Sequence, residues 1–389
     1  MRYSDFTRRI GGKGANAWII HERAIAAKRA GEPVIMLTIG DPDFDTPVAI
    51  RNAAHAALEA GDTHYPPIRG TPALRTALAA KLSQRYGRPV APETLIVMPG
   101  AQNALFASAL CLVGTGDEVV LLEPTYATYE ATFRAGGATL VTVPLRPEHG
   151  FQPDLAEIAQ AITPRTRAIV INSPHNPSGA VLPAATVRAI GDLAKAHDLW
   201  LISDEVYADQ CFDVPFTSAG SLADIADRTV VVSSFSKSHA MTGWRIGWVQ
   251  GPTALVDHLY TLSLAMMYGV PGFIQAAALA ALGEDAAVAD MREELRRRRD
   301  LVLHHLGGQN RVKVVKPDAG MFVMLDVRGT GLEPLPFAER LLEEERVSIL
   351  PADSFGPSAA GHLRMALAVP AEELGEACRR IVRFAGSLP

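Results

Sequence analysis

The chain of 389 residues has few cysteines, little net charge and no apolar run long enough to cross a bilayer. Its three cysteines are widely spaced, which excludes a disulfide framework and a cysteine-based metal knuckle. The formal net charge is −5 without a basic stripe, so no nucleic-acid partner is expected. The apolar stretch 105–114 is too short for a membrane span, and the N-terminus lacks the apolar core of a signal peptide. We therefore expect a cytoplasmic protein with no membrane partner and no metal site.

The remaining composition is that of a globular enzyme. Hydrophobic residues make up 48% and charged residues 20% of the chain, which is too apolar for disorder. A chain of this length exceeds what a single core usually serves, so two domains are expected.

From about residue 46 to 283, nearly continuous Val/Ile/Leu runs alternate with helical segments. The clearest β-type runs are 94–100, 118–124, 139–145, 166–174, 199–207 and 228–234. Strands of this kind are buried on both faces, which is typical of a mostly parallel sheet covered by helices. The pattern predicts an α/β fold with a three-layer α/β/α large domain.

After about residue 284 the pattern changes to a long charged helix near 291–306, several short strands and a final helix near 371–384. We predict a smaller α+β domain formed by both chain ends, 1–45 and 284–389, beside the large domain 46–283. The arginine-rich run of the charged helix is predicted to be a solvated helix face.

Polar and glycine-containing motifs stand where the predicted strands end. They are PGAQN (99–103), NSPHNPSG (172–179), SDEVY (203–207) and SSFSK (233–237). In parallel sheets, ligands bind outside the carboxyl ends of the strands. The sequence therefore predicts one ligand site built from these motifs.

The first motif, PGAQN, predicts a strand–turn–helix whose glycine lets the backbone approach a ligand closely. Free N–H groups at a helix N-terminus bind phosphate. Arg245 and the hydroxyl groups of Ser234 and Ser236 would complete a phosphate cup. Taken alone, the motif is equally compatible with an ordinary strand–helix turn.

Two ionisable residues stand close to the apolar runs. Lys237 follows one run among small and hydroxyl residues, and Asp204 ends another. A desolvated lysine near other cations has a lowered pKa and becomes a nucleophile towards carbonyls. Taken singly, Lys237 is also compatible with a surface lysine and Asp204 with a capping residue. Together, a phosphate cup, a buried carboxylate and a nucleophilic lysine match one cofactor, pyridoxal 5′-phosphate.

Six motifs, in order, carry a family resemblance over essentially the full length. They are TIGDPDFDTP (38–47), THYPPIRGTPALR (63–75), NSPHNPSG, SDEVY, SFSKSHAMTGWRIGW (234–248) and HLRMALA (362–368). The chain resembles the fold-type I, pyridoxal-phosphate-dependent aminotransferases of class I/II. The resemblance implies a ping-pong transfer of an α-amino group to a 2-oxo acid, through an internal aldimine and pyridoxamine phosphate. It also implies a homodimer whose active sites are built by both chains.

The resemblance assigns catalytic and ring-binding roles by motif. Lys237 is similar to the lysine that forms the internal aldimine and then shuttles a proton. Asp204 resembles the carboxylate that keeps the pyridine nitrogen protonated. Tyr207 and Asn176 resemble the pair that hydrogen-bond the phenolic oxygen, with Asn176 also near the substrate. Tyr126 matches the aromatic residue that stacks on the ring.

The same resemblance assigns the remaining contacts. Ala101 and Gln102 stand where backbone N–H groups meet the phosphate, and any side-chain contact from Gln102 is not expected. Tyr65 resembles the tyrosine that reaches the phosphate of the partner subunit. Arg364 matches the arginine that holds the substrate α-carboxylate in a bidentate fork. Gly40 lies on the N-terminal segment that closes over the substrate.

Within the family, the opening MRYSDFTRRI and the segment SFGPSAAGH (354–362) are similar to the bacterial members that move the amino group of L-arginine to pyruvate. A guanidinium pocket needs an acidic or π-rich wall. The candidates for that wall are Tyr126, Tyr268, Asp41 and Asp43.

Other activities of the same fold stay open at this point. They are an aspartate or aromatic aminotransferase using 2-oxoglutarate, a pyridoxal-phosphate β-lyase and an arginine oxidase. His175 and His239 flank the motifs, but Lys237 already supplies a general base, so no catalytic role is expected for either histidine.

Overall fold

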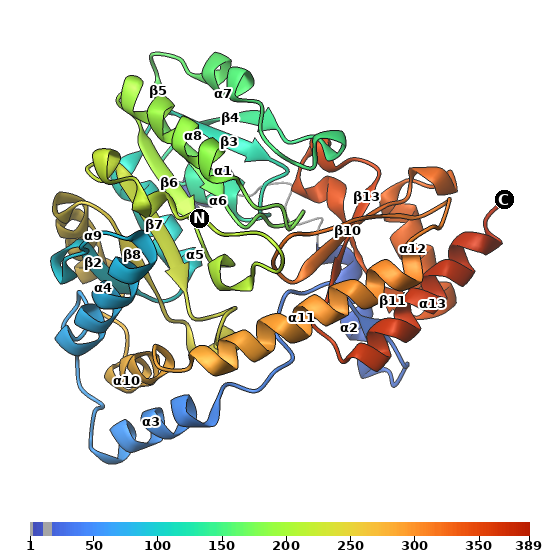
Figure 1. The fold of residues 1–389 in the computed structure, drawn as a ribbon, viewed down its shortest axis with the longest axis horizontal. Coiled ribbons are helices and arrows are strands. Elements are labelled where there is room, and N and C mark those ends of the chain that lie inside the picture. The colour runs from blue at the N-terminus through green and yellow to red at the C-terminus, as the bar shows by residue number, and fades with distance from the viewer. Residues whose placement is uncertain (1–2, 11–17) are drawn as a thin grey trace.

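The computed structural model describes residues 3–10 and 18–389. Residues 1–2 and 11–17, which belong to the predicted small-domain segment 1–45, lie outside the described residues. The larger part of the molecule is built on a seven-stranded sheet with helices on both faces (Figure 1). Its strands are β2 (Leu95–Met98), β3 (Glu118–Glu123), β4 (Thr139–Pro144), β5 (Thr166–Asn172), β6 (Trp200–Asp204), β7 (Thr229–Ser234) and β8 (Gly247–Gln250).

The strand order is β2-β8-β7-β6-β5-β3-β4. Five neighbouring strands, from β7 through β6, β5 and β3 to β4, pair in parallel. Only β8 runs antiparallel to its neighbours, β2 and β7, within this sheet. The prediction of a mostly parallel central sheet is therefore confirmed.

The continuous apolar character of the strands follows from burial on both faces. On β3, Val120 and Leu122 belong to the core that includes residues of α7 (Leu155–Ala161) and α8 (Ala184–Ala196). The alternating residues Val119 and Leu121 belong to the opposite core, with α5 (Ala101–Leu112), α6 (Tyr129–Arg134) and α9 (Thr253–Met266). Because side chains alternate along a strand, both sets must be apolar.

A second, antiparallel sheet has the order β12-β13-β10-β9. The strands outside the central sheet are β1 (Ile35–Met36), β9 (Lys313–Val315), β10 (Phe322–Asp326), β11 (Val347–Ser348), β12 (Leu350–Pro351) and β13 (His362–Ala366). The helices not yet named are α1 (Asp5–Ile10), α2 (Ile19–Arg29), α3 (Val48–Glu59), α4 (Pro72–Tyr86), α10 (Gly272–Ala281), α11 (Asp285–Leu306), α12 (Pro334–Glu345) and α13 (Ala371–Ser387).

Both ends of the chain contribute to one core beside the small sheet. β1 pairs in parallel with β11, so Ile35 lies opposite Val347. The N-terminal α2 lies among the C-terminal elements α12 and α13 (Figure 1), and Ile20 shares a buried cluster with Ile381. The boundaries predicted at 45/46 and 283/284 stay a prediction.

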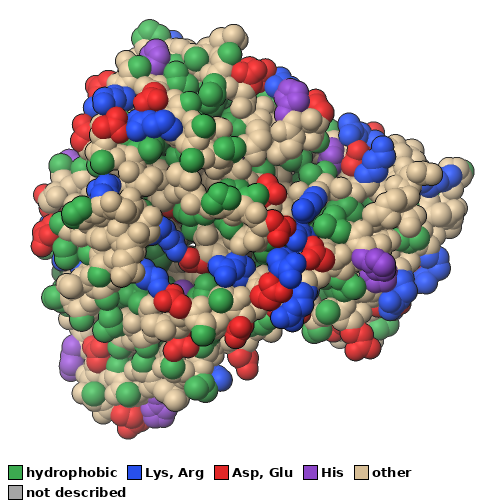
Figure 2. All heavy atoms as spheres, viewed as in Figure 1, with side chains coloured by type: hydrophobic (Ala, Val, Ile, Leu, Met, Phe, Trp, Pro, Cys, Tyr) green, Lys and Arg blue, Asp and Glu red, His purple; other side chains and the backbone are tan. Residues whose placement is uncertain are grey.

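The arginine-rich run of α11 differs from the prediction of a solvated face. Arg298 and Arg299 have side chains only 5% and 3% exposed, and they pair with Asp43 and Asp213. Both carboxylates come from distant segments, which the helical pattern does not reveal. In Figure 2, basic and acidic side chains lie next to one another over this part of the surface.

No helix in the described segments is long and apolar enough to cross a bilayer by itself. The bent pair α10 and α11 passes that test together, by length and composition alone, with 74° between its halves.

Candidate functional site

A cavity of about 230 Å³ lies at the carboxyl ends of the parallel strands. Asn172, Asp204 and Ser234, which end β5, β6 and β7, all line it. The cavity also brings together the predicted site residues Gly40, Ala101, Gln102, Tyr126, Asn176, Tyr207, Ser236, Lys237, Arg245 and Arg364. The strand-end motifs thus converge as the sequence predicts, although the role of each residue stays a prediction.

Lys237 presents its amine to this cavity from the segment after β7. Its Nζ donates a hydrogen bond to the carbonyl oxygen of Gly40 over 2.5 Å. Burial lowers the pKa of Lys237 to about 8, with smaller contributions from the positive charges of Arg364 and Arg245, while Asp41 acts in the opposite direction. A large share of neutral amine near pH 8 makes Lys237 a competent nucleophile.

Asp204 is buried at the end of β6 and is held at both oxygens. Tyr129 donates its phenolic hydrogen bond to Oδ2 over 2.6 Å, and the backbone N–H of Val206 donates to Oδ1 over 3.1 Å. Burial raises the pKa of Asp204 to about 6, and the two hydrogen bonds oppose this rise. A cation placed against this carboxylate would stabilise its charged form.

Tyr129 is a site residue that the sequence interpretation missed. It lies three residues after Tyr126 in PTYATY, and the two rings meet edge to face at 5.8 Å between centroids. A second tyrosine one helical turn after the expected stacking residue was the available signal. Its target, Asp204, lies 75 residues further along the chain.

Gly100 and Arg245 form a close-fitting cradle at the N-terminus of α5. Gly100 has φ +81°, and a Cβ built there would lie 2.6 Å from Nη2 of Arg245. Arg245 itself adopts a left-handed conformation at φ 51°, with Nη1 donating to the carbonyl oxygen of Thr242 over 2.7 Å. Free N–H groups in the first turn of α5, beside a guanidinium and Ser234 and Ser236, suit an anionic group such as phosphate.

The side chain of Gln102 is engaged elsewhere. Its Nε2 donates to Thr132 over 2.9 Å, and its Oε1 accepts from Thr128 over 2.6 Å. These contacts tie α5 to α6 and leave the backbone N–H as the group that Gln102 can offer a ligand. The contact of this backbone N–H with a phosphate stays a prediction.

Arg364 enters the cavity from β13 and is buried. Its Nη2 donates to the carbonyl oxygen of Thr38 over 2.7 Å and its Nη1 to Asn176 over 3.3 Å. The guanidinium carbon lies 4.1 Å from the ring centre of Phe322 and 4.9 Å from that of Phe355. Burial lowers the pKa of Arg364 to about 10, and Nε has no hydrogen-bond partner among the described residues. This cation therefore suits a carboxylate ligand.

Tyr207 and Tyr126 are aromatic residues of the cavity whose hydroxyl groups stay protonated. Burial is the main cause that raises the pKa of both phenols. Asn176 interacts with Tyr207 by a side-chain hydrogen bond and accepts one from Arg364. These contacts connect the predicted ring-binding pair to the predicted carboxylate site.

Tyr65 is the predicted site residue that does not line the cavity. It is 83% exposed and packs against Tyr268, with 5.2 Å between the ring centroids. An exposed pair of aromatic rings is available to a second subunit, but its contact with a partner's phosphate stays a prediction.

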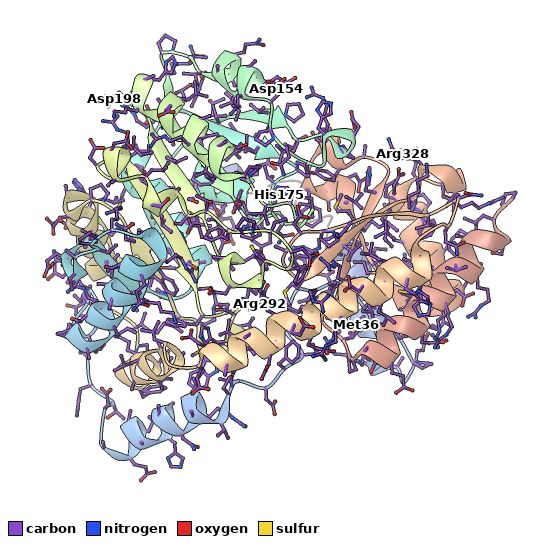
Figure 3. All side chains as sticks on the ribbon, in the orientation of Figure 1. Met36, Asp154, His175, Asp198, Arg292 and Arg328 are labelled. Carbon is purple, nitrogen blue, oxygen red and sulfur yellow. The ribbon has the colours of Figure 1, made fainter. Side chains whose placement is uncertain are left out.

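His175 lies in the interior (Figure 3) with both ring nitrogens engaged. Nε2 lies 2.8 Å from the carbonyl oxygen of Pro124 and Nδ1 lies 2.7 Å from the hydroxyl of Ser178. Burial lowers its pKa to about 4, so the neutral ring bridges two loops. No group of three or more potential metal ligands occurs in the described part of the chain.

The fold and this cavity place the chain in a known class. Residues 32–381 match the family described as aminotransferase class I and II. The chain therefore belongs to the class I and II aminotransferases, which act on small molecules and generally use pyridoxal phosphate.

The relatives of the chain include enzymes that are named for different substrates. The chain is 54% identical over 389 residues to arginine–pyruvate transaminase AruH of Pseudomonas aeruginosa, covering 100% of this chain and 99% of that protein. It is 38% identical to aspartate/prephenate aminotransferase of Thermus thermophilus, covering 94% and 95% of the two chains. The solved structure of aspartate aminotransferase from Thermus thermophilus with maleate has a TM-score of 0.93 at 37% identity, covering 99% of this chain and all of that chain. The predicted family and fold class are confirmed.

Proposed function

We propose that this aminotransferase uses pyridoxal 5′-phosphate to move the α-amino group of L-arginine to pyruvate. The observation that supports the cofactor is one cavity containing a desolvated lysine, a buried carboxylate and a glycine–arginine anion cradle. The observation that supports the substrates is 54% identity, over the whole chain, to a protein named for arginine and pyruvate.

The residues present fit this cofactor. When bound, pyridoxal phosphate supplies an aldehyde that takes up the amino group and an electron-withdrawing ring that acidifies the α-carbon. Lys237 would hold the aldehyde end through Nζ, and Asp204 would face the ring nitrogen. Arg245, with Ser234, Ser236 and the backbone of Ala101 and Gln102, would hold the phosphate.

The remaining groups would bind and orient the amino acid. Arg364 presents two guanidinium nitrogens, Nη1 and Nη2, that can turn from Asn176 and Thr38 towards an α-carboxylate. Gly40 keeps its carbonyl oxygen 2.5 Å from Nζ of Lys237, which fixes the amine that would carry the proton at the substrate α-carbon. Tyr207 and Asn176 would bind the phenolic oxygen, and Tyr126 would stack on the ring.

The proposal includes a cytoplasmic homodimer with shared active sites. The exposed pair formed by Tyr65 and Tyr268 supports this assembly, because aromatic side chains are enriched at subunit interfaces. Tyr65 would then reach the phosphate bound by the partner subunit.

A half-reaction screen tests the proposed function. Cofactor-loaded enzyme is mixed with L-arginine, L-alanine, L-aspartate or L-tyrosine without an acceptor, and the visible absorbance of the lysine-bound cofactor is followed. We expect arginine and alanine to remove this absorbance, and pyruvate to restore it after arginine. If only aspartate or tyrosine removes the visible absorbance, the enzyme has other substrates than arginine. Oxygen uptake with arginine as the sole substrate would indicate an oxidase.

Lys237→Ala provides the matched control. The variant should lack the visible band and show negligible turnover with every donor, because no other amine among the described cavity residues can replace Nζ. Retained turnover would contradict the role of Lys237.

A separate assay tests the β-lyase alternative. Release of pyruvate and ammonia from cystathionine by the wild type, without a 2-oxo acid, would indicate β-lyase activity.

A further inference from the structure

We propose that the indole of Trp18 recognises the cationic end of the amino donor and thereby selects arginine over uncharged amino acids of similar length. This inference rests on the arginine:pyruvate function proposed above and concerns the substrate side chain. Trp18 lines the cavity, immediately before α2, and was not among the residues that the sequence indicated.

The residues that the sequence suggested for a guanidinium pocket are engaged elsewhere. Asp43 pairs with the buried Arg298 through both oxygens, over 2.6 and 3.0 Å. Tyr268 packs on Tyr65 and does not line the cavity. Asp41 accepts a hydrogen bond from Thr242 over 2.6 Å and is not a lining residue either.

The acidic and aromatic groups that do line the cavity are mostly committed. Asp204 is the one acidic lining residue in the described part of the chain, and Tyr129 and Val206 hold it. Phe322 and Phe355 already face the guanidinium of Arg364.

The three lining tyrosines are committed as well. Tyr129 is bonded to Asp204, while Tyr126 and Tyr207 are assigned to the cofactor ring. The indole of Trp18 is therefore the remaining π-face among the described lining residues. Tryptophan is the side chain to which cations bind best through a ring face.

A chain of contacts connects Trp18 to the proposed carboxylate site. Its ring meets His21 edge to face, with 5.8 Å between centroids, and Nδ1 of His21 lies 2.8 Å from the hydroxyl of Thr38. The carbonyl oxygen of Thr38 accepts the hydrogen bond from Arg364. Trp18 and Arg364 thus line one cavity and contact the same segment of the chain, and the proposal places the cationic end of an amino acid held at Arg364 against the indole.

Replacement of Trp18 should leave the fold of α2 intact. Trp18 occupies the position before the first helical residue but makes no side-chain capping hydrogen bond. The ring is half-buried, so a smaller side chain does not open a cavity in a closed core. Specificity can therefore be tested without loss of the helix.

The test compares L-arginine with L-citrulline, which has nearly the same shape without the charge. For wild type, Trp18→Phe and Trp18→Leu, kcat and KM are measured for both donors with pyruvate as acceptor. We expect the arginine-over-citrulline ratio of kcat/KM to fall about threefold to thirtyfold in Trp18→Leu, mainly through KM for arginine, and less in Trp18→Phe.

Asp41→Asn tests the competing assignment, in which the carboxylate of Asp41 recognises the guanidinium group of the donor. An unchanged ratio in Trp18→Leu, or a ratio lost in Asp41→Asn but kept in Trp18→Leu, would overturn the proposal. An equal loss for both donors would also overturn it, because this is the result of a merely structural role. If the wild type does not use arginine at all, the proposed arginine:pyruvate function is wrong. This result differs from an unchanged ratio in Trp18→Leu, which contradicts only the role of Trp18.

Discussion

Tyr129 donates a hydrogen bond to Oδ2 of Asp204 over 2.6 Å, although α6 and β6 contribute the two residues from separate parts of the sequence. Both side chains are buried. A buried carboxylate without partners binds a proton readily, so hydrogen bonds to its charged form decide whether it can serve as a counter-ion. The phenol of Tyr129 therefore adjusts the group proposed to face the ring nitrogen of the cofactor.

Tyr129→Phe tests this adjustment. The change removes the hydrogen bond that lowers the pKa of Asp204 but keeps the ring contacts with Tyr126 and Phe133. The pKa of Asp204 should rise, the acid limb of kcat/KM should move to higher pH, and the cofactor dissociation constant should increase about tenfold. Equilibrium dialysis and a pH–rate profile measure the two effects. Wild-type values for both would contradict the role.

Gly100→Ala tests the proposed phosphate cradle. A Cβ at this position would lie 2.6 Å from Nη2 of Arg245 and would strain a residue at φ +81°. Arg245 must move, so the dissociation constant of pyridoxal phosphate should rise at least about tenfold. The dissociation constant of pyridoxal, which lacks the phosphate, should change much less.

Gly243→Ala is the matched control for the cradle. Gly243 lies two residues before Arg245, its added Cβ would meet nothing within 4 Å, and its φ is not in the left-handed region. This variant should bind both compounds like the wild type. If Gly100→Ala weakens pyridoxal as strongly as pyridoxal phosphate, the cradle does not serve the phosphate.

The strands and the convergence of their ends could be predicted from the sequence. Both faces of the strands are covered, so their apolar runs are nearly continuous, and the polar residues Asn172, Asp204 and Ser234 that line the cavity stand at the carboxyl ends of their strands. In a parallel sheet these ends must meet at one edge. Most residues of the candidate site can therefore be predicted from short sequence patterns.

The remaining site features depend on contacts between distant segments. Nothing near Asp204 in the sequence indicates Tyr129, and nothing in α11 indicates that Asp43 neutralises Arg298. The run of arginines follows the helical pattern of a solvated face, yet two of them are buried because tertiary carboxylates reach them. Trp18 likewise lines the cavity because distant segments pack together, and no local sequence pattern predicts that position.

Arg364→Lys tests the proposed carboxylate fork. A lysine has one ammonium group and cannot offer a carboxylate the two guanidinium nitrogens, Nη1 and Nη2, that Arg364 presents. KM for every amino donor should rise about tenfold or more, with a smaller fall in kcat. Because Arg364 packs on Phe322, a thermal melt must show that the variant is folded. An unchanged KM would contradict the carboxylate role.

Glu205 provides a test of pH-dependent stability beside the site. Its carboxylate is buried and accepts hydrogen bonds from Ser203, Ser218 and the backbone of Ala219. Burial raises the pKa of Glu205 from 4.5 to about 7. Between these two pH values the folded protein keeps a proton that the unfolded chain has released. The contribution of Glu205 to the free energy of unfolding therefore falls as pH rises from about 4.5 to about 7.

Glu205→Gln isolates this contribution. Asp204, with its raised pKa, gives a slope of the same sign, and His175, with its lowered pKa, gives a slope of the opposite sign. Both remain in the variant, so the difference between the two proteins reports Glu205. Urea unfolding of the cofactor-free proteins between pH 4.5 and 7.5 should show a steeper loss of stability in the wild type than in Glu205→Gln. Parallel curves would mean that Glu205 titrates alike in the folded and unfolded states.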